Sequence, residues 1–242
     1  MFRLMVRALI LYGLSAVPAQ GVEVTPMVIN FSPDDVVNVP YSLVYNQLSR
    51  DVAFDIQVYE VDFDPTGKTE PKLVPLEDSP LWVFPPSLYL KAGKSQRIQF
   101  RWVGESKPAV DKTYQVSLVE QPIADLPIEN QSKLTILLDV NLIVHIDQAA
   151  LTPDLRVGET YVKGDTIFAK VINNGAGAGR LSDYDIEVKN GNVEVENIAK
   201  QQLKSQGYDV FFPPNSTMFV KIPLSGLHKI NKNNTFKLEL MK

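Results

Sequence analysis

The sequence predicts an all-β protein with two β-sandwich domains in tandem. Runs of alternating apolar and polar residues recur along the 242 residues, and the chain has 17 prolines and 13 glycines to form turns between them. No helix-rich region is visible. The length suits one large β domain or two of about 100 to 120 residues. We favour two, because Asp147 to Pro153 resembles a short hinge between two β-rich sets.

The first 21 residues have the features of a secretory signal peptide. Arg3 and Arg7 precede an apolar run of about ten residues, Ala8 to Val17, and Ala19-Gln20-Gly21 offers small residues at the two positions that a signal peptidase reads. A transmembrane helix needs about 20 apolar residues, and this run stops well short of that length. We therefore expect cleavage before Val22 and export of the mature protein.

Composition argues against several classes of function. The net charge is -4, and removal of the two signal-peptide arginines leaves about -6 (-4 less two positive charges), so nucleic acid is not an expected partner. The chain has no cysteine, which removes thiolate catalysis and cysteine metal sites. An exported chain without cysteine fits the periplasm better than a eukaryotic extracellular location.

The predicted N-terminal domain, residues 22–147, contains β-rich runs separated by turn residues. The expected strands are Val22–Phe31, Val37–Gln47, Val52–Phe63, Leu81–Phe84, Leu88–Leu90, Ser95–Val103 and Tyr114–Glu120. In Ser95–Val103, one face consists of Ile98, Phe100 and Trp102, and the other consists of Arg97, Gln99 and Arg101. The polar face is either a solvated surface or an anion site, because guanidinium groups bind carboxylates.

The longest alternating run extends from Lys133 to Ile146, about 14 residues, whereas strands usually have five or six. One face of this run is apolar throughout and consists of Leu134, Ile136, Leu138, Val140, Leu142 and Val144. A strand that outruns its own sheet exposes apolar side chains and unpaired backbone groups, which another chain can use. The long loop before it is also rich in apolar residues, which is typical of a functional loop.

The predicted C-terminal domain, residues 148–242, contains a second β set. Its expected strands are Thr166–Asn173, Tyr184–Val188, Met218–Ile222 and Phe236–Met241, and Glu196–Ser205 has some helical character. Gly175–Gly179 is rich in glycine, but a strand rather than a helix is expected after it, so no helix N-terminus would receive a phosphate. We interpret this stretch as a hairpin connection.

No arrangement of residues indicates catalysis. His145 and His228 are the two histidines, and no Gly-x-Ser-x-Gly motif marks a nucleophile. Two histidines without cysteine also argue against a zinc site. We therefore expect a protein that is not an enzyme and that uses no metal or cofactor.

Three stretches together resemble the PapD-like periplasmic chaperones of the chaperone–usher pilus pathway. In Phe84–Trp102 a proline pair precedes a glycine-containing turn and a strand, and Tyr114–Pro122 is a Tyr-x-x-x-x-x-Glu-x-Pro strand end followed by a long loop. The third stretch is the alternating strand itself. Asn173–Leu181 is also similar to the asparagine–glycine stretch of the family's second domain. The resemblance covers the mature chain and implies two immunoglobulin-like domains.

This resemblance implies that the protein folds and caps pilus subunits by donor-strand complementation and delivers them to an outer-membrane usher. In that mechanism the chaperone lends its long strand to an incomplete immunoglobulin-like subunit. By position, Leu134, Ile136 and Leu138 match the inserted residues, and Val140 is a fourth. The exposed strand also predicts self-protection of the free protein, either as a self-capping dimer or by folding back of the long loop.

One feature departs from the family pattern. The best-known members hold the subunit's terminal carboxylate with an arginine in the first strand and a lysine late in the long strand. Here Val22–Phe31 contains neither residue, and the late position falls on or near Ile143, which resembles the archaic and alternative branches of the family. The candidate carboxylate anchors are Arg101 and Arg97, followed by Lys112 and Lys133.

Two other classes of function remain open. A secreted β-sandwich adhesin or pilus subunit would share the composition, but a subunit usually has a single incomplete domain. A glycan-binding protein or a hydrolase would need exposed aromatic residues or paired carboxylates. Trp82 and Trp102 lie in apolar strands and are expected in the core.

Overall fold

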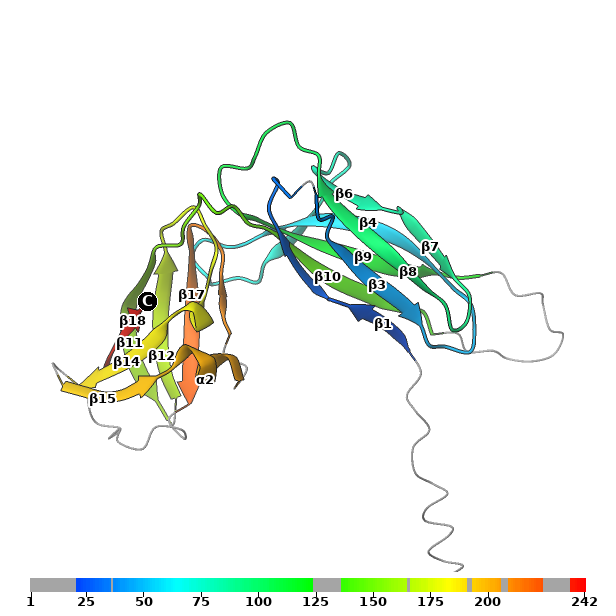
Figure 1. Ribbon diagram of the computed structural model, residues 1–242. Helices are drawn as coiled ribbons and strands as arrows, with labels where there is room; N and C mark the ends of the chain where they lie inside the picture. Colours follow the sequence, from blue (N-terminus) through cyan, green and yellow to red (C-terminus); the bar gives the residue numbers. More distant parts are fainter. Residues whose placement is uncertain are drawn as a thin grey trace, which may run out of the picture.

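The computed structural model describes residues 21–35, 37–123, 136–164, 166–190, 193–205, 209–223 and 236–242. Within these residues the chain forms two β-sandwiches that meet at one end (Figure 1), so the predicted all-β fold of two immunoglobulin-like sandwiches is confirmed. The predicted signal peptide lies outside the described residues, apart from Gly21. No helix among the residues described is long and apolar enough to cross a membrane.

The first sandwich packs a four-stranded sheet against a six-stranded one. The four-stranded sheet has the order β1 (Val22–Thr25), β3 (Tyr41–Asn46), β8 (Ser95–Trp102) and β6 (Leu81–Phe84). The larger sheet has the order β2 (Val28–Phe31), β10 (Asp139–Ile146), β9 (Lys112–Gln121), β4 (Val52–Asp62) and β5 (Lys72–Pro75), and β7 (Ser87–Leu90) also pairs with β4.

The first predicted strand, residues 22–31, is divided between the two sheets at Pro26. β1 pairs with β3 in one sheet, and β2 pairs in parallel with β10 in the other. Proline has no N–H group, so a regular ladder cannot continue through it. Because β2 begins only at Val28, it pairs with residues 143–146 of β10 and with none of residues 139–142.

The core of the first sandwich follows the predicted alternation. Ile98 and Phe100 of β8 are fully buried, and so are Val116 and Leu118 of β9. These side chains share one core cluster with residues of β10, because period-two alternation points them all into the space between the sheets.

The second sandwich has its own separate core. One sheet has the order β11 (Leu155–Lys163), β12 (Thr166–Asn173) and β17 (Ser216–Pro223), and the other has the order β15 (Val193–Ile198), β14 (Asp185–Asn190) and β18 (Phe236–Met241). The short pair β13 (Gly179–Arg180) and β16 (Phe211–Phe212), the 3-10 turn η1 (Leu181–Asp183) and the helix α2 (Lys200–Ser205) complete the domain.

Two expectations for this domain need correction. The helical character expected for residues 196–205 is limited to α2, because β15 continues to Ile198. β11 was not expected, and its register against β12 shifts between Val157 and Thr160. A bulge of this kind moves the following side chains to the opposite face, so the sequence of β11 does not alternate regularly.

Candidate functional site

A single apolar stripe runs along β10 and the residues 136–138 before it, and it passes from the core into solvent. Leu142, Val144 and Ile146 are completely buried, and Val140 is partly buried against the same core. Leu138 is also partly buried, but Ile136, on the same face, is 68% exposed. These residues share one face because successive side chains of a strand alternate. Leu134, the remaining predicted member, lies outside the described residues.

One edge of β10 is uncovered beside this stripe. Ile143 N donates a hydrogen bond to Met27 O at 2.9 Å, so the odd-numbered residues of β10 direct their backbone groups toward β2, and the even-numbered residues direct theirs toward β9. β2 reaches only residues 143–146. Among the described residues, no strand pairs with residues 139–142 on this edge. The backbone groups of Leu137, Asp139 and Asn141 therefore face an edge that a partner strand can use.

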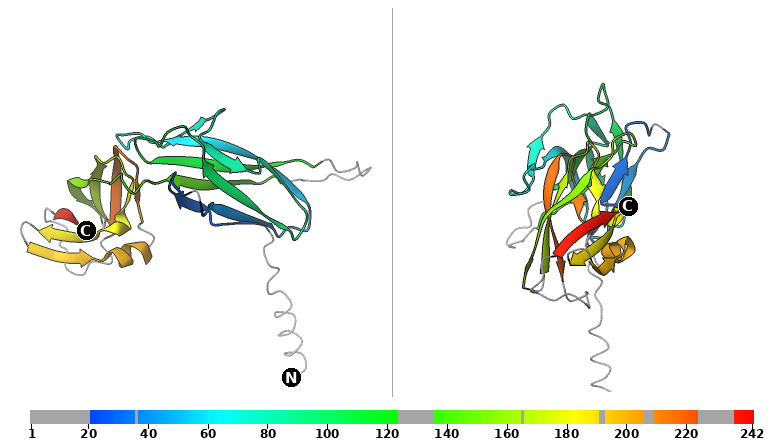
Figure 2. Two further views of the ribbon diagram at one scale, coloured as in Figure 1. Left: turned by 45° about the horizontal axis from the view of Figure 1, so that its top comes forward. Right: turned by 90° about the vertical axis from the view of Figure 1, so that its left-hand side faces the viewer.

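The exposed part of the stripe lies at the end of the first sandwich remote from the second sandwich (Figure 2). The opposite end of β10 contacts the second sandwich, where the His145 ring stacks on Phe211 with centroids 4.4 Å apart. His145 Nδ1 and Thr113 Oγ1 share a hydrogen bond of 2.9 Å, which fixes the ring from the side of the first sandwich. β10 therefore serves both as a joint between the domains and as an open strand.

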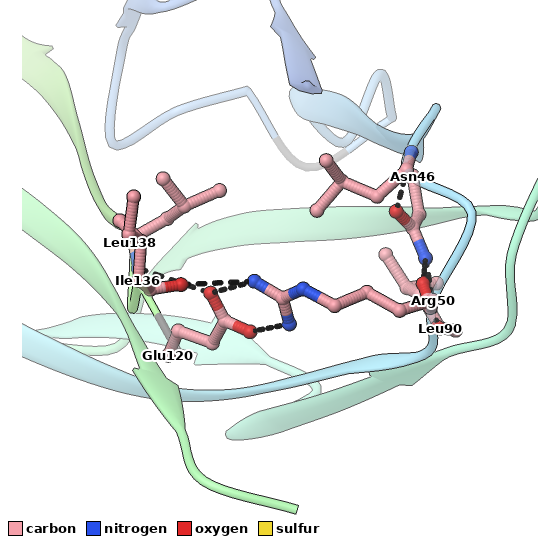
Figure 3. Close-up of polar contacts among 7 residues, drawn as sticks. Asn46, Arg50, Leu90, Glu120, Ile136 and Leu138 are labelled. Atoms are coloured by element: carbon pink, nitrogen blue, oxygen red, sulfur yellow. Dashed lines mark hydrogen bonds and ion pairs between the residues drawn. The ribbon is translucent and has the colours of Figure 1, made fainter. Parts of the chain in front are cut away.

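An ion pair between a buried carboxylate and a partly exposed arginine lies where β10 separates from β9 (Figure 3). The Glu120 side chain is 1% exposed, and Arg50 bonds both of its oxygens, with Nη2 to Oε2 at 3.1 Å. Glu120 Oε2 also accepts a hydrogen bond from Leu138 N at 3.0 Å, and Arg50 Nη2 donates one to Ile136 O at 3.1 Å. A buried carboxylate requires such partners. Glu120 belongs to the Tyr114–Pro122 motif identified in the sequence. Arg50 lies 70 residues earlier and is part of no motif, so the sequence did not predict this pair.

A pocket of about 430 Å³ lies between the sandwiches. Its lining includes Asp111 and Asp147 from the first sandwich and Arg180 and Phe211 from the second. Burial raises the pKa of Asp147 to about 6, with a smaller contribution from Asp111 and an opposing one from Arg180. Burial also lowers the pKa of His145 to about 4, and the charge of Arg180 acts in the same direction. Arg180 was not recognised in the sequence, because its neighbours come from both domains.

The candidate carboxylate anchors lie on different sheets. Arg97 and Arg101 are exposed on the same face of β8, and the Arg97 guanidinium lies 4.5 Å from the ring centroid of Tyr41. Lys112 begins β9 in the other sheet and bonds Glu60 at 2.5 Å. Lys133 lies outside the described residues. The structure thus groups the two arginines and separates them from Lys112.

The expectation that Trp82 lies in the core is wrong. Its side chain is 41% exposed and stacks on Phe84 with ring centroids 5.3 Å apart, because Leu81 and Val83 occupy the inward positions of β6. Trp102 is partly buried against the core, as expected. In the described part of the chain, no group of His, Asp or Glu side chains is arranged to hold a metal ion.

No known protein family and no curated protein matches the sequence. Solved structures do match the fold. The class 5 fimbriae chaperone CfaA is 15% identical, with 92% of this chain and 99% of CfaA covered and a TM-score of 0.55. A chain from the CsuC–CsuE chaperone–tip adhesion subunit pre-assembly complex of the archaic chaperone–usher Csu pili of Acinetobacter baumannii is 14% identical, with 90% and 97% covered and a TM-score of 0.51.

A chain from the complex of Salmonella enterica SafA pilin with the SafB chaperone is 15% identical, with 86% of each chain covered and a TM-score of 0.50. At these identities the likeness establishes the fold. The chain therefore has the two-sandwich fold of pilus chaperones, and the resemblance predicted from the sequence is confirmed at that level.

Proposed function

We propose that this protein is a periplasmic chaperone that binds pilus subunits by donor-strand complementation and delivers them to an outer-membrane usher. The observation that carries the proposal is the apolar stripe of β10 and residues 136–138, which is fully buried at Leu142 and 68% exposed at Ile136. A monomeric protein gains nothing from extending a core stripe into solvent, whereas a strand-donating protein requires it. The chaperones among the similar structures support the same reading.

In the proposed complex, a subunit that lacks one strand pairs with the uncovered edge of β10. The backbone of Leu137, Asp139 and Asn141 forms the ladder, and the inserted side chains are those of Leu134, Ile136, Leu138 and Val140. Burial of each apolar side chain contributes about 1.5 to 3 kcal/mol, so three or four of them dominate the affinity before ordering costs are subtracted.

The remaining assignments belong to the same proposal. Residues 1–21 form the signal peptide, residues 22–147 form the domain with the subunit-binding strand, and residues 148–242 form the second domain. Arg101 and Arg97, then Lys112 and Lys133, are the candidates for holding the subunit's terminal carboxylate. Retention of subunit binding by Arg101→Ala would remove Arg101 from this set.

The test is co-purification from the periplasm with candidate pilus subunits. Ile136→Asp places a charge in the proposed groove, and we expect it to weaken the heterodimer by at least roughly a hundredfold. Leu73→Asp is the matched control, because Leu73 is 44% exposed on β5, at the edge of the sheet away from β10. Equal binding by the parent and Ile136→Asp would show that the strand has no role in binding.

One observation favours the alternative of a secreted glycan-binding protein or adhesin. Trp82 and Phe84 form an exposed stacked pair, and exposed aromatic rings can bind sugar faces. A glycan screen of the parent and of Trp82→Ala separates the two functions. Binding of a glycan that depends on Trp82, together with no co-purified subunit, would favour the alternative.

A further inference from the structure

We propose that Arg50 and Glu120 form a clamp that holds residues 136–138 extended and leaves only one edge of this segment open to a partner strand. The inference rests on the proposed function, since it concerns how the donated strand is presented. It assigns a positioning role to two residues outside the inserted stripe.

The clamp begins with an interruption of the β9–β10 ladder. The regular pairing ends at Asp139 and Val119, so the next opposed residues are Leu138 and Glu120. One expected backbone bond is present, from Glu120 N to Leu138 O at 3.0 Å. Leu138 N instead donates to the side-chain oxygen Oε2 of Glu120, also at 3.0 Å. The carboxylate takes the place of a backbone acceptor, and the regular ladder stops there.

Arg50 extends the clamp from Leu138 to Ile136. Its Nη2 donates both to Glu120 Oε2 and to Ile136 O, at 3.1 Å each. Its own backbone is fixed, because Arg50 O accepts a hydrogen bond of 2.8 Å from Asn46 Nδ2, and Asn46 is completely buried. Asn46 Nδ2 also donates to Leu90 O at 3.1 Å. Figure 3 shows this path from the buried amide through the guanidinium to the exposed segment.

The bonds are directional. Leu138 N–H, Leu138 C=O and Ile136 C=O all point toward β9, and Glu120 and Arg50 satisfy all three. The peptide groups of Leu137 and Asp139 point the opposite way, toward the uncovered edge. A partner strand can therefore pair from one side only, and a segment that is already extended loses less conformational entropy on binding.

The first test needs no partner. The chain has no native cysteine, so nitroxide labels can be attached at Leu137→Cys and Leu73→Cys in the mature protein. Leu73 is exposed on β5, in the same sheet as β10. Double electron–electron resonance should give a narrow distance distribution in the parent and a clearly broader one after Arg50→Met. Arg156→Met, which removes the exposed pair with Asp154 in the second sandwich, is the control and should leave it narrow.

A distribution that stays as narrow in Arg50→Met as in the parent would overturn the clamp. If Arg50→Met does not fold, the same measurement in Arg50→Lys decides, because one ammonium nitrogen cannot reproduce the contacts of two guanidinium nitrogens with both Glu120 oxygens and Ile136 O. With a co-purified subunit, Arg50→Lys should bind roughly ten- to a hundredfold more weakly than the parent. Unaffected binding by Ile136→Asp would instead refute the proposed function. In that case the distance distributions alone would test the clamp.

Discussion

Asp111 Oδ2 accepts a hydrogen bond of 2.8 Å from Ala178 N, a residue of the second sandwich 67 positions later in the chain. Asp111 Oδ1 accepts another from Gln148 N at 3.0 Å, and Asp111 N donates to Ala176 O at 3.0 Å. One residue of the first sandwich thereby contacts both the linker at Gln148 and the loop between β12 and β13 of the second sandwich. Both carboxylate oxygens of Asp111 therefore link the first sandwich to the second.

We predict that Asp111→Asn loosens this joint. An asparagine amide has one acceptor oxygen, and its NH₂ group would face a backbone N–H, which costs about 1 to 3 kcal/mol. Urea unfolding should show the lower stability, and small-angle scattering should show a wider spread of domain orientations. Asp154→Asn, at an exposed pair with Arg156, is the control. Unchanged scattering and stability in Asp111→Asn would mean that other contacts hold the domains.

A glycine contact beside the same joint gives a second prediction. A Cβ added at Gly177 would lie 2.6 Å from Leu151 O, whereas one added at Gly158 would lie no closer than 3.5 Å to any neighbour. We expect Gly177→Ala to lower the free energy of unfolding by roughly 1 to 3 kcal/mol, since the backbone must shift, and Gly158→Ala to have little effect. Thermal unfolding of the two variants checks this. Similar melting temperatures would show that the loop adjusts without strain.

The stability of the protein should depend on pH through two opposing groups. His145 has a folded pKa of about 4 against 6.5 ordinarily, because it is buried and close to Arg180. Between these values the unfolded chain binds a proton that the folded chain does not, so stability rises with pH. Burial raises the folded pKa of Asp147 from 3.8 to about 6, with Asp111 adding to the effect, so its contribution to stability falls as pH rises through that window.

Asp147→Asn removes the contribution to stability that falls as pH rises. It leaves the contribution of His145, which rises with pH. The free energy of unfolding, measured with urea between pH 4 and 6.5, should therefore rise more steeply with pH in Asp147→Asn than in the parent. His145→Phe should change the slope in the opposite direction. Parallel pH profiles for Asp147→Asn and the parent would contradict the assignment of Asp147.

Alternation along single strands predicted the core of the first sandwich, because period two alone decides which of Ile98, Phe100 and their neighbours share a face. Alternation could not predict which side chains face the core where all residues of a strand are apolar, or where a bulge changes the face. All four residues of β6 are apolar, so the sequence could not show that Trp82 points outward. The register shift between Val157 and Thr160 interrupts the alternation in β11, so this strand was not predicted.

The candidate site was predictable only in part. The stripe that contains Ile136 is a local pattern and is visible in the sequence. The Arg50–Glu120 pair joins residues 70 apart, and Arg180 meets Asp147 only through the contact between the sandwiches. Contacts of this kind arise from the tertiary fold, and no spacing along the chain signals them.

The apolar stripe of β10 and residues 136–138 should divide into a structural half and an exposed half. Leu142→Ala removes a fully buried side chain and should lower the free energy of unfolding by about 2 to 5 kcal/mol. Ile136→Ala removes an exposed one and should change it by less than about 0.5 kcal/mol. Urea unfolding of both variants makes the comparison. A large loss in Ile136→Ala would indicate that Ile136 packs within the protein rather than awaiting a partner.

The uncovered edge of β10 should also make the free protein self-associate. An open strand edge beside exposed apolar side chains pairs readily with a second copy, so we predict a self-capping dimer that forms reversibly as concentration rises. Light scattering across a concentration series should show the dimer in the parent and not in Ile136→Asp, whose charge opposes burial of the stripe. An added subunit that uses the same edge should dissociate the dimer. A parent protein that stays monomeric at high concentration would show that the edge is protected without a second copy.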